Sequence, residues 1–221
     1  MRGNRDYQPA GVSANGKVYD EVFVRRVHQL IAMGYDAMLK TLDFSDSAEE
    51  DITGELRDRI AELFDSKSAP KWMDKFNIHN EDPVRGSKRK GKKRPKLDIH
   101  FCSSYTRPRT RMCFEAKRLD PRYGAANYIG GKGLGRFVGC KYAKDDKVAG
   151  MLGYVQSDDP AEWADKIELA LKQKAKILCV ANKGHWCKRK VVVELPWTYW
   201  SRHDRRSAGS IEILHTLLPF N

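Results

Sequence analysis

Two strand-like segments carry charged side chains at spacings suited to chemistry. Residues 97–102 (LDIHFC) alternate apolar and polar side chains, and residues 111–117 (RMCFEAK) do so less cleanly. The stretch between them contains a proline and has the composition of a loop, so the sequence predicts an antiparallel hairpin. Because side chains two apart on a strand share a face, we expect Asp98, Glu115 and Lys117 to meet on one face of this hairpin.

Such a grouping favours metal-assisted chemistry on phosphate. Asp98 and Glu115 would supply oxygen ligands to a hard divalent cation, Mg²⁺ or Mn²⁺, and the backbone carbonyl of Ala116 would add a third ligand. Lys117 would position or help deprotonate the water that attacks phosphorus, and would steady the developing charge. Each residue also has an ordinary interpretation, since E-x-K is a common solvent-facing pair. The apolar neighbours Phe114 and Ala116 indicate instead a buried strand, where a charged pair is costly unless it has a task.

The charge of the chain points to a polyanionic partner. Lysine and arginine number 41 against 29 acidic residues, a net charge of +12, and residues 85–96 (RGSKRKGKKRPK) hold eight of these cations. Each phosphate that a lysine or arginine neutralises releases counterions, so we expect this stretch to bind nucleic acid, DNA rather than RNA. A solvated loop without function is the alternative. The predicted contacts are Lys88, Arg89, Lys90, Lys92, Lys93, Arg94 and Lys96.

Arg136 closes the glycine-rich stretch GGKGLGR, which lacks the spacing of a phosphate-binding loop. With Tyr142 it is a further candidate for contact with the DNA backbone; a plain tight turn is the alternative. His203, Arg205 and Arg206 form a later basic cluster, predicted to be a surface patch or a second phosphate contact.

Hydrophobic periodicity predicts the elements that position these residues. A long helix is expected over residues 18–42, and its apolar face would pack on the main domain, a second copy of the chain or a partner protein. A second helix is expected from Ser47, with Ser47 and Glu50 as a capping box and an apolar stripe from Ile52 to Leu63. Residues 66–84 have the composition of an irregular segment.

The second half of the chain alternates strand and helix patterns. Strands are predicted at residues 150–156, 176–181 and 190–195, with a last apolar run at 211–218. Asp159 and Pro160 begin a helix between the first two of these strands. The fold class is therefore α/β (or α+β), a central mixed β-sheet flanked by helices.

Other features limit the class of protein. The five cysteines are odd in number and form no CxxC pair, which argues against a disulfide framework and a structural zinc site and fits a reducing, cytoplasmic location. No signal peptide and no membrane-spanning segment are expected, because no long apolar run is present.

Asp98 within PKLDIHF, followed by CFEAKR at 113–118, resembles the signature of the PD-(D/E)XK nuclease superfamily. Leu97 stands where the signature has proline, and the recognisable pattern covers about residues 45–155. The resemblance implies a restriction-endonuclease-like core of a helix, a three-stranded antiparallel meander, a helix and a further strand. It also implies that Asp98 and Glu115 hold the metal and that Lys117 is the catalytic lysine.

The family often adds an acidic residue from the first core helix, and Glu49 falls within the inward stripe of the predicted helix, with Glu50 as the reserve. The chain is thus expected to be a metal-dependent nuclease, with residues 1–44 as an N-terminal arm and helix and 45–221 as the nuclease domain. By analogy with the family, it would act in restriction or in defence against phage and other foreign DNA. The alternative is a catalytically silent nucleic-acid-binding or assembly subunit with the same fold.

Overall fold

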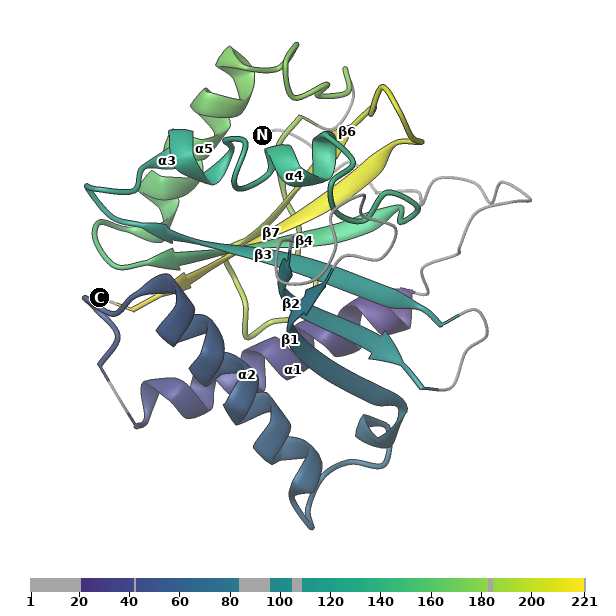
Figure 1. Cartoon of the computed structure of the whole chain (residues 1–221). Coiled ribbons are helices and arrows are strands. Elements are labelled where there is room, and N and C mark those ends of the chain that lie inside the picture. Colours follow the sequence, from purple (N-terminus) through teal and green to yellow (C-terminus); the bar gives the residue numbers. More distant parts are fainter. Residues whose placement is uncertain (1–20, 42, 84–95, 105–108, 183–184, 221) are drawn as a thin grey trace, which may run out of the picture.

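The computed structural model describes residues 21–41, 43–83, 96–104, 109–182 and 185–220, with the side chains of residues 80–83 excepted. These residues form an α/β fold around a seven-stranded mixed sheet of order β1-β2-β3-β4-β7-β6-β5 (Figure 1). The expected class, a central mixed sheet flanked by helices, is confirmed. The strands are β1 (Phe76–Pro83), β2 (Lys96–Ser103), β3 (Arg111–Leu119), β4 (Val148–Val155), β5 (Cys187–Lys188), β6 (Thr198–His203) and β7 (Ile211–Pro219).

The centre of the sheet is parallel and its two sides are antiparallel. β4 pairs in parallel with β3 on one side and with β7 on the other. β1, β2 and β3 form an antiparallel meander, and β5, β6 and β7 form a second antiparallel group. A parallel strand is covered on both faces, which is why β4 reads as an almost continuous apolar run (VAGMLGYV). The predicted hairpin of residues 97–102 and 111–117 is confirmed as β2–β3.

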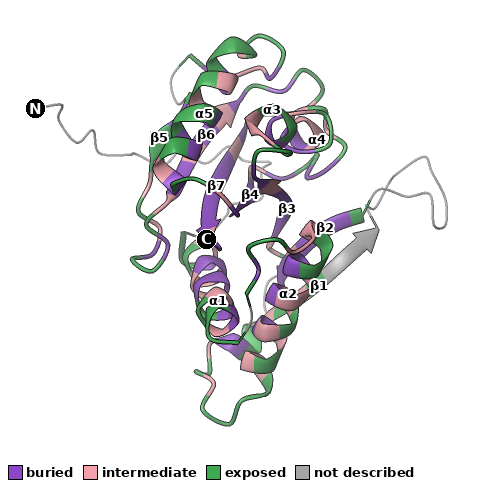
Figure 2. Cartoon of the chain, turned by 90° about the vertical axis from the view of Figure 1, so that its left-hand side faces the viewer, coloured by how far each residue is buried: buried purple, intermediate pink, exposed green. Residues whose placement is uncertain are grey.

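Helices cover the two faces of the sheet in separate groups. α1 (Glu21–Leu39) and α2 (Glu49–Asp65) pack on one face, where Phe114 of β3 and Leu152 of β4 point. α3 (Ala125–Tyr128), α4 (Gly135–Val138) and α5 (Pro160–Gln173) cover the other face, where Met151 points. Figure 2 shows the buried central strands between these two layers. A short 3-10 helix, η1 (Met73–Lys75), precedes β1.

α1 belongs to the main hydrophobic core. Val27, Leu30, Ile31 and Met38 are fully buried there, and the Tyr35 hydroxyl donates a hydrogen bond to the Pro219 carbonyl. The apolar face of the predicted first helix is therefore covered by the chain's own sheet and α2. The division at residue 44 and a partner bound through this helix stay predictions.

Three local expectations are wrong. α2 begins at Glu49 after Ala48, with no side-chain cap, so Ser47 and Glu50 form no capping box. β1 lies within the segment expected to be irregular; it is an edge strand, and among its described side chains Phe76 and Ile78 pack on the core. No strand forms over 176–181 or 190–195: the first is a series of turns in which Cys179 has a φ of 51°, a left-handed conformation that interrupts an extended strand.

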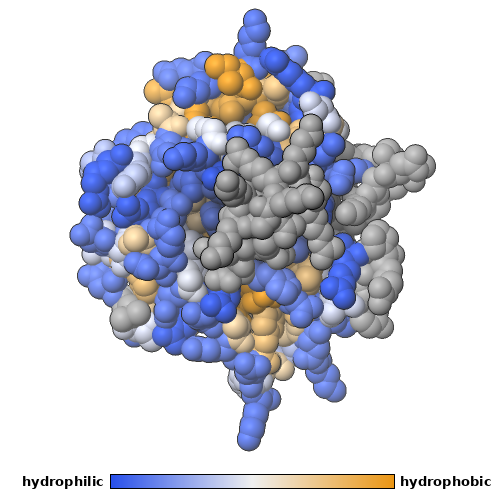
Figure 3. All heavy atoms as spheres, in the orientation of Figure 1, coloured by the Kyte–Doolittle hydropathy of each residue, from blue (hydrophilic) through white to orange (hydrophobic). Residues whose placement is uncertain are grey.

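The surface agrees with the charged composition. Hydrophilic residues predominate on the face drawn in Figure 3, and hydrophobic residues gather there at a few places. Within the described residues, no helix combines the length and apolar character that crossing a membrane requires.

Candidate active site

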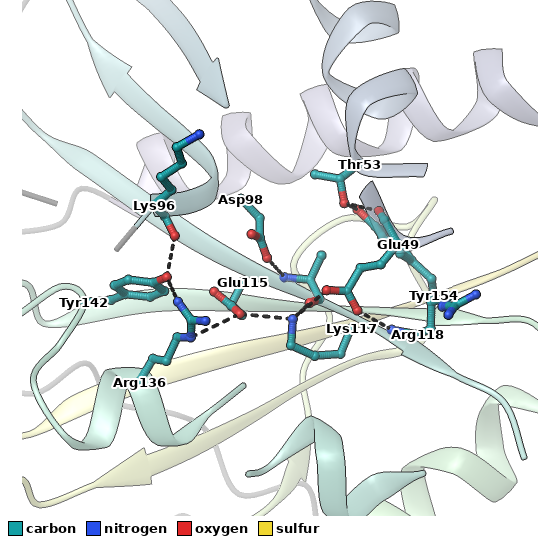
Figure 4. A network of polar contacts seen from close by, with 11 residues as sticks. Glu49, Thr53, Lys96, Asp98, Glu115, Lys117, Arg118, Arg136, Tyr142 and Tyr154 are labelled. Carbon is teal, nitrogen blue, oxygen red and sulfur yellow. Dashed lines mark hydrogen bonds and ion pairs between the residues drawn. The ribbon is translucent and has the colours of Figure 1, made fainter. Parts of the chain in front are cut away.

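The candidate site lies where β2 and β3 separate. Their ladder runs from Cys102–Arg111 to Ile99–Phe114. Beyond that pair, the amide of Ala116 donates to Asp98 Oδ2 at 2.8 Å, so a carboxylate takes a hydrogen bond that a backbone carbonyl would otherwise accept. We call this place the β2–β3 fork. It allows side chains from α2 and from α4 to reach the same point of β3 (Figure 4).

Glu115 is the centre of the cluster. It is 2% exposed, and its Oε1 lies 3.0 Å from Lys117 Nζ and 3.5 Å from Arg136 Nε. Its Oε2 is buried and accepts no hydrogen bond from the described residues. Burial, followed by the negative charge of Asp98, raises the pKa of Glu115 to about 8. A buried carboxylate with an oxygen that accepts no hydrogen bond needs a proton or a cation as its partner.

Lys117 joins the cluster to the first turn of α2. Its Nζ lies 2.6 Å from Glu49 Oε1 and 2.5 Å from the carbonyl of Ala116. Burial lowers the pKa of Lys117, but the carboxylates of Glu115 and Glu49 outweigh burial and leave it raised. The ammonium group therefore stays protonated in this arrangement, which favours charge stabilisation over deprotonation of water.

Asp98 faces the same group of charges from β2. Burial raises the pKa of its carboxyl group, and the hydrogen bond from Ala116 and the charge of Lys117 partly offset that rise. Two carboxyl groups with raised pKa values, on neighbouring strands, are typical of functional sites.

Glu49 enters the cluster as the first residue of α2. Its Oε2 accepts the amide of Arg118 at 3.1 Å, while its Oε1 meets Lys117. Glu50 is exposed. The stripe that placed Glu49 inward is thus matched by the geometry.

Two residues that the sequence did not single out hold Glu49 in place. Thr53 Oγ1 donates to the Glu49 carbonyl at 2.7 Å, so the buried Tyr154 hydroxyl, 3.0 Å away, donates to Thr53. The signal was present in principle, because a tyrosine within an apolar strand needs a partner for its hydroxyl group.

Arg136 approaches from α4. Its guanidinium group lies over the Tyr142 ring, 5.0 Å from the centroid, and donates to the Tyr142 hydroxyl, which in turn donates to the carbonyl of Lys96. Arg136, which the sequence predicted as a contact with the DNA backbone, is therefore also a direct neighbour of Glu115.

Lys96 is exposed at the start of β2. The other basic residues predicted to bind nucleic acid, Lys88, Arg89, Lys90, Lys92, Lys93 and Arg94, lie outside the described residues.

Of the basic cluster predicted from His203, Arg205 and Arg206, only Arg206 is exposed at the surface. His203 and Arg205 are buried, and Arg205 donates to the carbonyls of Ala143, Asp146 and Gly209. These contacts tie loops together, so the two side chains have structural partners and do not offer their charge to phosphate.

The cluster offers carboxylate and carbonyl oxygens, which are the donors that a hard divalent cation binds. Within the described part of the chain, no group of three or more His, Cys, Asp or Glu side chains is arranged to hold a metal ion. The carboxylates instead surround the Lys117 ammonium group, and the Ala116 carbonyl is bonded to it. The carboxylate oxygens of Asp98, Glu115 and Glu49 are nevertheless hard donors of the kind that Mg²⁺ and Mn²⁺ prefer, and Glu115 Oε2 has no hydrogen bond from the described residues.

Comparison of the chain with models of protein families, with curated proteins and with solved structures found no match.

Proposed function

We propose that this chain is a divalent-metal-dependent nuclease that hydrolyses phosphodiester bonds of DNA. One observation carries the proposal: Glu115, a buried carboxylate with a lone oxygen, lies among Asp98, Lys117 and Glu49 at the β2–β3 fork. If these groups served only folding, apolar side chains of similar volume in their place would make the fold more stable, because burial of charges costs free energy.

The order of elements supports a restriction-endonuclease-like fold of the PD-(D/E)XK superfamily. α2 precedes the antiparallel meander β1–β2–β3, and the short helices α3 and α4 then lead to β4, which lies parallel beside β3. This is the order that the resemblance of Asp98 and Glu115-Ala116-Lys117 to the family implies.

Each residue of the cluster has a role in the proposed reaction. Asp98 and Glu115 hold the cation, Mg²⁺ or Mn²⁺, with Glu49 and the Ala116 carbonyl as further oxygens. The cation would supply positive charge to a phosphate oxygen. Lys117, protonated, orients the attacking water and stabilises the negative charge that develops on the phosphoryl oxygens. Asp98 is fixed for this task by the amide of Ala116.

A nucleic-acid substrate is supported by charge. The chain carries +12, and Lys96 and Arg136 lie on the α4 side of the cluster. A nucleic acid binds more tightly with each lysine or arginine side chain that contacts one of its phosphates. The setting of restriction or defence against foreign DNA is part of the proposal and rests on family analogy.

One observation favours the second candidate, a silent nucleic-acid-binding subunit. Lys117 Nζ already lies between Glu49 and Glu115, at 2.6 and 3.0 Å, so an internal ion pair compensates part of the negative charge. If Lys117 never left this position, the cluster would stabilise the fork without holding a cation.

The experiment separates the two candidates. Supercoiled plasmid, linear duplex, single-stranded DNA and RNA are incubated with the protein in Mg²⁺, Mn²⁺ or EDTA. We expect cleavage with either cation, none with EDTA, and none by Asp98→Ala or Lys117→Ala. Lys172→Ala, an exposed lysine of α5, serves as the control and keeps full activity. Binding without cleavage under every condition supports the silent subunit, and cleavage by both site variants contradicts the assigned residues.

A further inference from the structure

The α3–α4 segment, residues 125–147, forms a rigid rim beside the cluster. Leu134 donates its amide to the Tyr128 carbonyl, and Gly135 donates its amide to that of Gly130. A Cβ at Gly133 would lie 2.1 Å from the Tyr128 carbonyl oxygen, so this close approach requires glycine. The rim therefore holds its side chains in place beside β3.

The rim is basic where it meets solvent. It contains one arginine and four lysines against two acidic residues, one of which, Asp146, is buried against Arg111. The exposed lysines of the rim are Lys132, Lys141 and Lys144.

The opposite rim of the cluster is acidic. Residues 43–56, which include the first turn of α2, contain no lysine or arginine, and Asp43, Asp46, Glu50 and Asp51 are exposed there. A phosphate chain that passes over the cluster is therefore attracted to the α3–α4 side and repelled from the α2 side.

Arg136 is the residue of the basic rim that reaches the cluster. It meets Glu115 through Nε and Tyr142 through Nη1, and its Nη2 makes no hydrogen bond with the described residues. Its side chain is 27% exposed, whereas that of Glu115 is 2% exposed. The guanidinium group thus stands between a buried carboxylate and solvent, with donors left for a second anion.

We infer that Arg136 exchanges partners: it pairs with Glu115 in the cation-free protein and binds a substrate phosphate when a divalent cation takes its place on Glu115. The inference rests on the proposed function. The physical cause is competition, because Arg136 and the cation are both attracted to Glu115, and the cation repels the guanidinium group toward the phosphate. Tyr142 keeps the arginine at the edge of the cluster during the exchange.

If Arg136 and the cation compete for Glu115, removal of Arg136 should shift the affinities for Mn²⁺ and for DNA in opposite directions. Arg136→Gln removes a competitor of the cation, so Mn²⁺ affinity measured by calorimetry without DNA is expected to rise by about threefold or more. The same variant loses a phosphate contact, so affinity for a labelled 20-base-pair duplex in Ca²⁺ falls by about tenfold and the salt slope by about 1. A merely structural arginine would weaken both.

Arg122→Gln is the matched control, because Arg122 is an exposed arginine on the acidic side, paired with Asp46 and Asp120. It is expected to change neither affinity.

Arg136→Lys is the second variant. The shorter side chain pairs less tightly with Glu115, so Mn²⁺ affinity rises. The positive charge is kept, so DNA affinity and the salt slope stay close to those of the original protein. Thermal unfolding checks that each variant folds; if Arg136→Gln does not fold, Arg136→Lys carries the test.

The outcomes are distinguishable. A fall in Mn²⁺ affinity in either folded Arg136 variant, or unchanged DNA affinity in Arg136→Gln, overturns the exchange and leaves the nuclease proposal standing. An original protein that binds no Mn²⁺ overturns both the metal site and the exchange. Higher Mn²⁺ affinity together with lower DNA affinity in Arg136→Gln, and no change of either affinity in Arg122→Gln, establish the exchange.

Discussion

Two clusters of buried polar side chains lie in this fold, and they differ in charge and in completeness. The carboxylate cluster at the β2–β3 fork contains Glu49, Asp98, Glu115 and Lys117. The histidine cluster lies between α3, β6 and β7 and contains Tyr128, Ser201, His203 and His215. The first is charged and leaves Glu115 Oε2 without a partner, whereas the second is neutral and complete.

The hydrogen bonds of the histidine cluster run in one direction. His203 Nδ1 donates to the Leu178 carbonyl at 2.7 Å, so its Nε2 accepts from the Ser201 hydroxyl at 2.7 Å. Ser201 then accepts from His215 Nε2 at 2.8 Å, and His215 Nδ1 accepts from the Tyr128 hydroxyl. Burial lowers the pKa of His203 to about 4 and holds the pKa of His215 well below its ordinary value of 6.5, so both rings are neutral. Every ring nitrogen has a partner.

The difference between the two clusters indicates that the histidine cluster stabilises the fold and that the carboxylate cluster is the better candidate for a functional site. A complete neutral network stabilises the fold and has no group left for a ligand. A charged cluster with a lone oxygen costs stability and is kept where that oxygen has a task.

The largest effect is expected from Glu115→Gln. Loss of the central carboxylate should lower DNA cleavage by about 10³-fold, because the cation that would neutralise the developing negative charge loses its central ligand. Below pH 8 stability should not fall, since the buried Glu115 side chain, with its pKa raised to about 8, is already neutral there and an amide is no harder to bury. Initial rates and urea unfolding measure the two quantities. A stable variant with unchanged cleavage would contradict the role of Glu115.

Ser201→Ala should show the reverse pattern. The substitution leaves His203 Nε2 and His215 Nε2 without partners, which should lower the free energy of unfolding by roughly 3 kcal/mol. Cleavage per folded molecule should stay unchanged, because the histidine cluster is not part of the fork. Urea unfolding and activity at equal folded concentration provide the check; loss of specific activity would mean that the two clusters are coupled.

The two clusters should also respond to pH with opposite signs. The folded pKa of His203, about 4, lies below its ordinary value of 6.5, so the unfolded chain binds more protons between these values. Stability is therefore complete above pH 6.5 and falls by about 2–3 kcal/mol as the pH drops through 4. Unfolding followed from pH 7 to pH 4 measures this loss, and a flat profile would argue against a buried neutral ring.

For Glu115 the folded pKa, about 8, lies above its ordinary value of 4.5, so here the folded state binds more protons. Its contribution to stability is complete below pH 4.5 and is lost as the pH rises through 8. Asp98, Lys117 and Arg136 face this carboxyl group and set its pKa. In EDTA, Glu115→Gln should therefore remove the part of the alkaline decline that Glu115 contributes; an identical decline in both proteins would contradict the raised pKa.

The smallest effect is expected from Tyr154→Phe. Thr53 loses the hydrogen bond from the tyrosine hydroxyl, so the first turn of α2 and Glu49 are held less firmly. Cleavage should fall by about three- to tenfold at a stability cost near 1 kcal/mol. Tyr35→Phe, which removes a hydroxyl bonded to the Pro219 carbonyl and to no residue of the carboxylate cluster, is the matched control and should leave cleavage unchanged.

The sequence predicted the parts of the fold that strong periodicity specifies. Alternation placed β2 and β3 as a hairpin, and the apolar stripes placed α1, α2 and α5. β1 was missed because an edge strand with one buried face lacks a continuous apolar run. β6 was also missed: strands were predicted over residues 176–181 and 190–195 instead, where apolar runs gave a strand-like signal.

The candidate site was predictable within β2, β3 and α2, where spacing fixes which side chains share a face. The pairing of Arg136 with Glu115 was not, because it depends on how the α3–α4 segment turns back over β3. The burial of His203 and Arg205 was not predictable either, since composition does not reveal that loops supply their carbonyl partners.

Direct measurement of Mn²⁺ binding tests the central claim most closely. Titration of the metal-free protein, followed by the magnetic resonance signal of free Mn²⁺, should show saturable binding in the original protein and in Ser201→Ala. Glu115→Gln should weaken that binding by at least about 10-fold, since the cation loses its central charged ligand. Equal Mn²⁺ affinity in the original protein and Glu115→Gln, or no binding in either, would contradict the account.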